Sequence, residues 1–360
     1  MRSTTFAVLF LAGPALAQPP AEIAPYFAPP KEFAAAFGDY RNPLLFNDGS
    51  KVTDAAGWAK RRAEILATWT DLMGEWPAVI DAPKAEWLTP MKKDGYTRFA
   101  AKIEVAPGRV SDDAILLVPD GKGPFPAVVV VFYDAKTGAG EGKEPERDFA
   151  RQLAKRGFVA LSFGSAPESY YPDKTAKLQP LSYHAYEAAN LRNALARRAD
   201  VDPNRIGVMG HSYGGKWAMF AGALNEKFAA AAWSDPGIVF DEKRSNVNYW
   251  ERWYLGHEVG NARKPGTPND ANPRTGPYKL MVEKGHDLHE IHALMAPRPF
   301  LVSGGSEDPA ERWKALNHSV AVNALLGQKF GVAMTTRPKH DPTPESNAVL
   351  VRFFEWALRK

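Results

Sequence analysis

The stretch "RIGVMGHSYGGKWAMFAGAL", residues 205–224, constrains the fold more than any other part of the chain. The apolar residues at its start are typical of a buried strand, and the alanine-rich part after Gly214 is typical of a helix. Ser212 lies where the two meet, inside the pattern G-x-S-x-G. Because Gly210 and Gly214 carry no Cβ, strand and helix can approach closely while the serine hydroxyl is exposed in a strained turn. The stretch therefore predicts a strand–turn–helix unit that presents a serine nucleophile.

Beyond about residue 96, segments typical of strands alternate with segments typical of helices. Several strands are continuously apolar, as expected where helices cover both faces of a sheet. The first strands have short connections, which favours antiparallel pairing. The class is therefore α/β, with a mainly parallel mixed sheet flanked by helices. We expect strands near 96–105, 114–118, 127–132, 158–163, 205–210, 229–234, 299–304 and 331–337, and helices near 146–156, 183–198, 214–224, 310–326 and 344–359.

The first 17 residues have the three regions of a secretory signal peptide. An early arginine precedes a short apolar run at residues 6–11, and the small-residue pattern Ala15-Leu16-Ala17 precedes Gln18. The apolar run is too short to span a bilayer. We therefore expect cleavage after Ala17 and a secreted or periplasmic protein, without a membrane span.

Residues 18–95 are expected to form an N-terminal extension packed on the core. Proline, alanine and aromatic residues dominate up to about residue 50, and a helical pattern follows, with Thr53 or Asp54 as N-cap and Gly74 as its stop. Residues 96–360 are then the catalytic domain. Residues 236–295 are an insertion before the next-to-last strand.

Composition restricts the classes of function. The chain has 360 residues, 45% of them apolar, and the 45 basic and 41 acidic residues are scattered without a long basic run. A large core is therefore possible, and nucleic acid is not an expected partner. The chain has no cysteine, which excludes disulfides, thiolate nucleophiles and cysteine-based zinc sites.

A serine nucleophile needs a base, and the base needs an acid. His340, in "TTRPKHDPTPE", comes after the last strand and before the last helix, where the histidine of a G-x-S-x-G hydrolase belongs. Two acids follow neighbouring strands: Asp308 in "LVSGGSEDP" and Asp235 in "WSDPG". We favour Asp308 and keep Asp235 as the second candidate.

Backbone N–H groups near the serine are expected to stabilise an oxyanion. The N–H of Tyr213 lies at the start of the helix, where the helix dipole favours negative charge. The second donor is expected in the loop after the strand at 127–132, near Tyr133.

The segment "EKGHDLHEIHALM" resembles a metal cluster, with His286, His289 and His292 at every third position. Residues spaced three apart drift around a helix, so the three side chains do not easily share one ion. We therefore favour a structural helix edge, and we expect no metal or organic cofactor.

From about residue 96 onward, the chain resembles the α/β-hydrolase superfamily, and within it the glucuronoyl esterases and bacterial acetylxylan-type esterases. The segments "GHSYGGKWAMFAGALNEKFAAAAWSDPG", "DLHEIHALMAPRPFLVSGGSEDP" and "RPKHDPTPE" carry the resemblance. It implies Ser212 as nucleophile, His340 as base, and an acid at Asp308 or Asp235. It also implies that Lys216 binds a sugar hydroxyl. Glucuronoyl esterases usually have arginine directly after the serine, where this chain has Tyr213.

The insertion carries the aromatic segment "NVNYWERWYLG". Insertions above the carboxyl ends of the strands commonly shape the substrate pocket. Trp250 and Trp253 are therefore candidates for a platform under a sugar ring, and packing of the insertion onto the core is an equally good interpretation.

These observations predict an exported serine esterase that hydrolyses carboxylic esters, on carbohydrate of the acetyl or glucuronoyl type, through an acyl-enzyme. Two alternatives stay open. One is a serine peptidase of the prolyl oligopeptidase kind, and the other is a catalytically inert carbohydrate-binding protein on the same fold.

Overall fold

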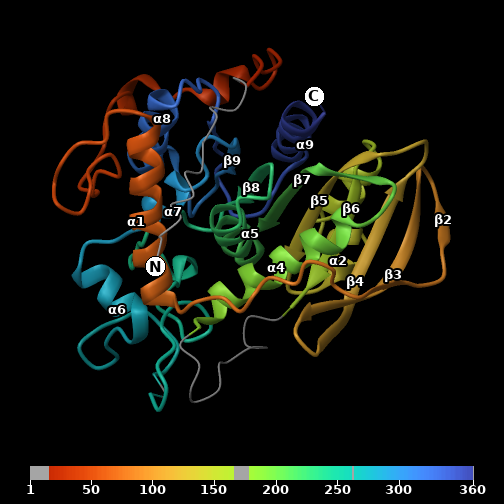
Figure 1. Ribbon diagram of the computed structural model, residues 1–360, viewed down its shortest axis with the longest axis horizontal. Coiled ribbons are helices and arrows are strands. Elements are labelled where there is room, and N and C mark those ends of the chain that lie inside the picture. The colour runs from red at the N-terminus through yellow and green to blue at the C-terminus, as the bar shows by residue number, and fades with distance from the viewer. Residues whose placement is uncertain (1–15, 166–177, 262, 360) are drawn as a thin grey trace, which may run out of the picture.

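The computed structural model describes residues 16–165, 178–261 and 263–359. In these residues, one ten-stranded mixed sheet runs in the order β1-β3-β4-β6-β5-β7-β8-β9-β10, and β2 pairs with β3. The strands from β5 to β10 are parallel to one another, whereas β1 to β4 pair antiparallel, as the short connections predicted. Figure 1 shows β2, β3 and β4 at one end of the sheet and β9 towards the other.

The strands are β1 (Ala85–Trp87), β2 (Met91–Lys93), β3 (Tyr96–Ala106), β4 (Arg109–Pro119), β5 (Phe125–Phe132), β6 (Val159–Gly164), β7 (Val201–His211), β8 (Ala230–Ser234), β9 (Phe300–Ser303) and β10 (Val332–Thr335). The helices are α1 (Ala55–Met73), α2 (Ala135–Ala139), α3 (Phe149–Ala154), α4 (Pro180–Ala196), α5 (Tyr213–Leu224), α6 (Gly276–Glu283), α7 (His289–Ala293), α8 (Trp313–Leu325) and α9 (Pro344–Leu358). The chain therefore has the expected α/β architecture.

Two hydrophobic cores cover the two faces of the sheet. Successive side chains of a strand point to opposite faces. Accordingly, Val129 and Val131 of β5 belong to the core that α4 and α5 cover, whereas Val128 and Val130 belong to the core that α3 and α9 cover. Figure 1 also shows α1, α6, α7 and α8 gathered at the end of the sheet where β9 lies. The parallel strands are thus buried on both faces, which is why they are continuously apolar.

The N-terminal extension packs on this core. Helix α1 is capped by Asp54, whose side chain accepts a hydrogen bond from the Gly57 backbone at 2.7 Å, and it ends at Gly74, as predicted. Ahead of it, the buried Phe27 packs against Trp356 of α9, with ring centroids 5.0 Å apart.

The predicted boundary at residue 95 needs a correction. Strands β1 and β2 lie before it, and both pair with β3. The sheet therefore begins at Ala85, inside the predicted extension. The reason is that these two short strands lie at the edge of the sheet, where few of their side chains are buried and the apolar pattern is weak.

The predicted signal peptide falls mostly on residues 1–15, outside the described residues. Leu16 and Ala17 are described, and both contact the body of the protein: the Leu16 backbone donates to Gln328 Oε1 at 3.0 Å, and Trp356 Nε1 donates to the Ala17 carbonyl at 3.0 Å. Within the described residues, none of the helices combines the length and apolarity that crossing a bilayer requires.

The three histidines of the insertion point to different partners. His286 Nδ1 lies 2.8 Å from Glu290, and His289 Nε2 lies 2.7 Å from the carbonyl of Arg41 in the extension. His292 is fully buried, stacks on Trp233, and has no hydrogen-bond partner for either ring nitrogen among the described residues. Burial lowers the pKa of His289 to about 4 and that of His292 to about 3. His289 and His292 are therefore structural residues whose imidazoles are neutral near pH 7.

The neutral state of His292 predicts a pH-dependent stability. Below pH 6.5 the unfolded chain protonates this side chain and the folded chain does not, so His292 destabilises the fold increasingly as the pH falls from 6.5 towards 3. We expect His292→Leu to gain free energy of unfolding relative to wild type by about 1.4 kcal/mol for each pH unit in this window.

Urea unfolding of both proteins at pH 7.5 and pH 5.0 measures the effect. Comparing the two proteins at each pH is necessary because Asp287, whose pKa burial raises to about 7, titrates in the opposite sense. An equal stability difference at both pH values would contradict a neutral, buried His292.

Candidate active site

The turn between β7 and α5 has the strained geometry that the G-x-S-x-G pattern predicted. Ser212 has φ 55° and ψ −115°, in a region that residues with a side chain rarely adopt. A Cβ on Gly210 would lie 2.2 Å from the backbone of Gly214, and one on Gly214 would lie 2.0 Å from the carbonyl of Val131. Both glycines are therefore required for the close approach of strand and helix.

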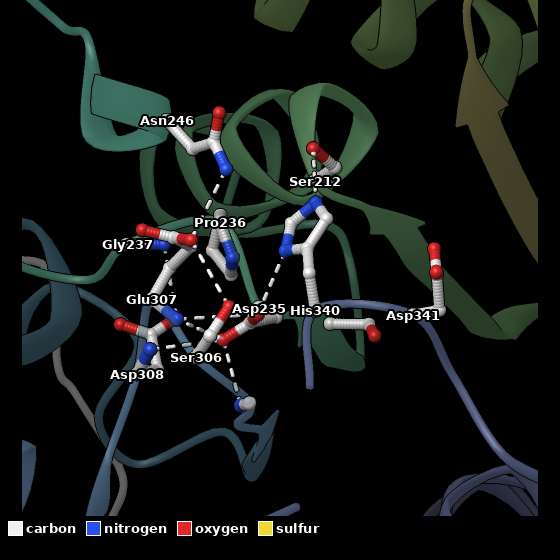
Figure 2. Close-up of polar contacts among 12 residues, drawn as sticks. Ser212, Asp235, Pro236, Gly237, Asn246, Ser306, Glu307, Asp308, His340 and Asp341 are labelled. Carbon is white, nitrogen blue, oxygen red and sulfur yellow. Dashed lines mark hydrogen bonds and ion pairs between the residues drawn. The ribbon is translucent and has the colours of Figure 1, made fainter. Parts of the chain in front are cut away.

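Ser212, His340 and Asp235 form a continuous chain of hydrogen bonds (Figure 2). The Ser212 Oγ lies 2.9 Å from His340 Nε2, and His340 Nδ1 lies 2.7 Å from Asp235 Oδ2. The three residues follow β7, β10 and β8, whose carboxyl ends meet at one edge of the sheet because the strands are parallel. The arrangement allows His340 to accept the serine proton while Asp235 holds its other nitrogen protonated.

The carboxylate of Asp235 is fully buried and is held by backbone amides of the loop after β9. Oδ1 accepts hydrogen bonds from the N–H groups of Gly305 at 2.6 Å, Glu307 at 3.2 Å and Asp308 at 2.9 Å. Asp235 itself has φ 50°, so a second non-glycine residue of the site is strained. These donors supply the hydrogen bonds that a carboxylate without exposed surface would otherwise lack.

The preference for Asp308 as the partner of the histidine is corrected by this geometry. The side chain of Asp308 is fully buried, and its carboxylate oxygens are bound by backbone N–H groups and not by His340. It accepts hydrogen bonds from the N–H groups of Gly237 at 2.9 Å and Ile238 at 2.6 Å. Burial, followed by the nearby charge of Asp235, raises the pKa of Asp308. Asp308 therefore holds the segment that follows Asp235, and the second sequence candidate lies against the base.

The two predicted oxyanion residues lie beside the serine. Tyr213 is the first residue of α5, so its N–H belongs to the start of the helix. Tyr133 directly follows β5, and its ring lies 4.7 Å from the ring of Tyr213. The loop after β5 thus runs next to the nucleophile turn.

Two residues beside the triad were not identified from the sequence as functional candidates. His211 packs on His340 with ring centroids 4.7 Å apart, and burial, followed by the proximity of His340, holds its pKa well below the usual range. Arg337 donates to the backbone carbonyl of His340. The available signal was their position, directly before Ser212 and three residues before His340.

Lys216 lies under the insertion instead of on an open surface. Its side chain is 2% exposed, and its ammonium donates to the carbonyls of Pro236 at 2.7 Å and Asn246 at 2.9 Å. Burial lowers the pKa of Lys216 to about 8. In this arrangement it ties the insertion to α5, which corrects the expected contact with a sugar hydroxyl.

The aromatic residues of the insertion divide between the two interpretations. Trp250 is 1% exposed and donates to Glu251 at 3.1 Å, so it packs the insertion and is not a platform. Trp253 is half-buried beside Tyr254 and stays a candidate for substrate contact.

Comparison with known proteins places the chain among hydrolases. Residues 113–243 match the dienelactone hydrolase family, and residues 182–311 match the prolyl oligopeptidase family. The 4-O-methyl-glucuronoyl methylesterase 1 of Wolfiporia cocos is 28% identical, over 89% of this chain and 81% of the relative, and that of Phanerochaete chrysosporium is 25% identical, over 87% and 69%. A glucuronoyl esterase from Solibacter usitatus superposes with a TM-score of 0.65 at 20% identity, covering 90% of this chain and 99% of that structure.

The fold and these matches define an α/β-hydrolase with a mainly parallel mixed sheet flanked by helices. The chain is a carboxylic ester hydrolase of the serine α/β-hydrolase type, and its homologues are glucuronoyl esterases.

The positions of the two acids predict different consequences for their amide variants. Asp235→Asn removes the carboxylate that keeps His340 Nδ1 protonated, so the histidine presents the wrong tautomer to Ser212. We expect turnover of an ester to fall by a factor on the order of 10³ to 10⁴.

Asp308→Asn is the matched control, because it changes the neighbouring buried acid, which does not contact His340. We expect a lower melting temperature and a smaller loss of turnover. Steady-state kinetics on the two purified variants decide between them, and a larger loss of turnover in Asp308→Asn would reverse the assignment.

Proposed function

We propose that the protein is an exported serine esterase that hydrolyses carboxylic esters on carbohydrate through a covalent acyl-enzyme. The observation that carries the proposal is the hydrogen-bond chain from Ser212 through His340 to Asp235. The homology to glucuronoyl methylesterases supports the carbohydrate ester, and the signal-like pattern of residues 1–17 supports export.

In the first half of the proposed reaction, Ser212 Oγ attacks the ester carbonyl while His340 Nε2 takes its proton. Asp235 stabilises the imidazolium that forms. Collapse of the tetrahedral intermediate breaks the bond to the alcohol, which leaves with the proton from His340. Ser212 then carries the acyl group.

In the second half, water attacks the acyl-enzyme and His340 takes the proton of the water. The acid leaves, and His340 returns the proton to Ser212. In both halves the oxyanion is stabilised by the N–H of Tyr213 and by a donor in the loop at Tyr133. Preorganised donors of this kind need no rearrangement during the reaction, and they lower the activation barrier by several kcal/mol.

The ester is of the acetyl or glucuronoyl type. The relatives named glucuronoyl methylesterases support a uronate ester. Tyr213 stands where those enzymes usually carry arginine, which leaves an acetyl ester as an equal candidate. Trp253 is proposed to contact the sugar, since it is the one of the two candidate tryptophans that keeps an exposed part.

A serine peptidase is the second candidate because residues 182–311 match the prolyl oligopeptidase family. That match covers the nucleophile turn and both acids, which ester and amide hydrolases share, so it does not select the peptide bond. An ester and an amide of the same acyl group separate the two candidates.

Labelling and turnover test the proposed function together. A fluorophosphonate probe is expected to label the wild type at Ser212 and to leave Ser212→Ala unlabelled, since the probe needs an activated serine. The matched control is Ser319→Ala, at a buried serine of α8, which is expected to label as the wild type does.

The substrate panel comprises an acetylated xylo-oligosaccharide, a feruloyl ester, a methyl glucuronate ester and an aminoacyl amide. We expect one of the carbohydrate esters to be hydrolysed fastest, and this activity to be lost in Ser212→Ala. A preference for the amide would support the peptidase, and a wild type that neither labels nor turns over would support an inert binding protein.

A further inference from the structure

All three nitrogens of the Arg337 guanidinium donate hydrogen bonds at the edge of the sheet where the triad lies. It follows β10, and its side chain folds back across the ends of the neighbouring strands. Nη1 donates to the carbonyl of Ser303 at 2.7 Å and of Gly304 at 3.2 Å, Nη2 to the carbonyl of His340 at 2.5 Å, and Nε to the carbonyl of Asp341 at 2.8 Å. A guanidinium has five N–H donors in a fixed plane, so these contacts impose a geometry on their partners.

The contacts join the segments that carry the triad. Nη2 of Arg337 also lies 3.2 Å from the hydroxyl of Ser234, the residue directly before Asp235. The carbonyl of Ser303 accepts the N–H of Asp235, at 3.1 Å, as well as the guanidinium. One half-buried side chain therefore links the ends of β8 and β9 to the backbone of the catalytic histidine.

The loop from Arg337 to Asp341 is closed by its own first residue. The guanidinium accounts for the carbonyls of His340 and Asp341, while Pro338 and Lys339 between them are exposed. Among the described residues, the hydrogen bond from Arg337 is the one that the backbone of His340 makes. The imidazole, however, has to keep both the 2.9 Å and the 2.7 Å hydrogen bond at once.

We propose that Arg337 is a positioning residue for ester hydrolysis: it acts through the backbone of His340 and holds the imidazole between Ser212 and Asp235. The inference rests on the proposed function, because it concerns the same triad. Arg337 does not touch the reacting atoms. Its effect is on the fraction of molecules in which both hydrogen bonds of His340 are formed.

The other groups that face His340 do not take over this role. Asp235 binds the imidazole and His211 packs on its face, and both contact the ring instead of the backbone. Asp341 is paired with Arg147 at 2.7 Å, an ion pair whose acid is largely exposed, and such pairs contribute little.

Arg298 offers a matched control for Arg337. It is also half-buried, and its guanidinium donates to the carbonyls of Gly222, Phe228 and Leu294 at 2.7 to 3.1 Å. None of these carbonyls belongs to a residue of the triad. Replacing either arginine by methionine therefore removes a clamp on backbone carbonyls, and only one of the two clamps holds the catalytic histidine.

The experiment compares Arg337→Met, Arg337→Lys and Arg298→Met with the wild type. The kcat and KM for p-nitrophenyl acetate, the rate of labelling by the fluorophosphonate probe, and the melting temperature are measured for each. We expect Arg337→Met to lower kcat and the labelling rate by about ten- to a hundredfold with KM within about twofold, since misplacing a catalytic group by about 1 Å costs up to about a hundredfold.

Arg337→Lys keeps the charge but not the fork, so we expect its kcat to lie between those of Arg337→Met and the wild type. Arg298→Met is expected to lower the melting temperature and to leave kcat within about twofold. If Arg337→Met does not fold, a loss of at least threefold in kcat in Arg337→Lys supports the proposal.

Two results would overturn the inference. One is an Arg337 variant that folds and keeps the wild-type kcat and labelling rate, and the other is an Arg298→Met variant that loses kcat to the same extent. Failure of the proposed function is distinguishable, because the wild type would then either show no labelling at Ser212 or prefer the aminoacyl amide to the esters.

Discussion

Two buried carboxylates and the loops that carry them hold the site together. Asp235 accepts hydrogen bonds from amides of the loop after β9, and Asp308, on that loop, accepts hydrogen bonds from amides of the segment after Asp235. A buried carboxylate without donors is costly. Each loop therefore supplies hydrogen-bond donors to the acid that the other loop carries. The imidazole of His340 is bound to Asp235, one of these two carboxylates, and Ser212 Oγ is bound to the imidazole.

Hydrogen bonds between neighbouring segments also hold the strained backbone of Ser212 and Asp235, the first and last residues of the triad. Ser212 and Asp235 both have positive φ without being glycine. Each is held by a hydrogen bond to the neighbouring strand: the N–H of Ser212 donates to the carbonyl of Ser234 at 2.8 Å, and that of Asp235 to the carbonyl of Ser303 at 3.1 Å. Strained residues persist only where the surrounding structure over-determines them. Here the surrounding structure is the edge of the sheet at which the parallel strands β7 to β10 end.

Much of the fold, and the serine and histidine of the site, could be predicted from the sequence because their signals are local. Apolar runs and helical spacing gave the central strands and α1 with its Asp54 cap, and the glycines around Ser212 gave the turn. His340 followed from its place after the last strand. The short edge strands β1 and β2 were missed because few of their side chains are buried, which leaves little pattern to read.

The sequence by itself determined that a serine, a histidine and two acids would come to one edge of a sheet. Each of these residues follows a segment whose own apolar pattern predicts a buried strand, and buried strands of this kind are typical of a parallel sheet. Only the tertiary structure decided that Asp235 faces the imidazole while Asp308 binds backbone amides, that Lys216 and Trp250 are buried, and that Arg337 reaches His340. The physical reason is that these choices depend on hydrogen bonds between loops distant in the chain. Which carbonyl or amide lies within reach of a side chain is set by the path of another loop, and no local pattern encodes that path.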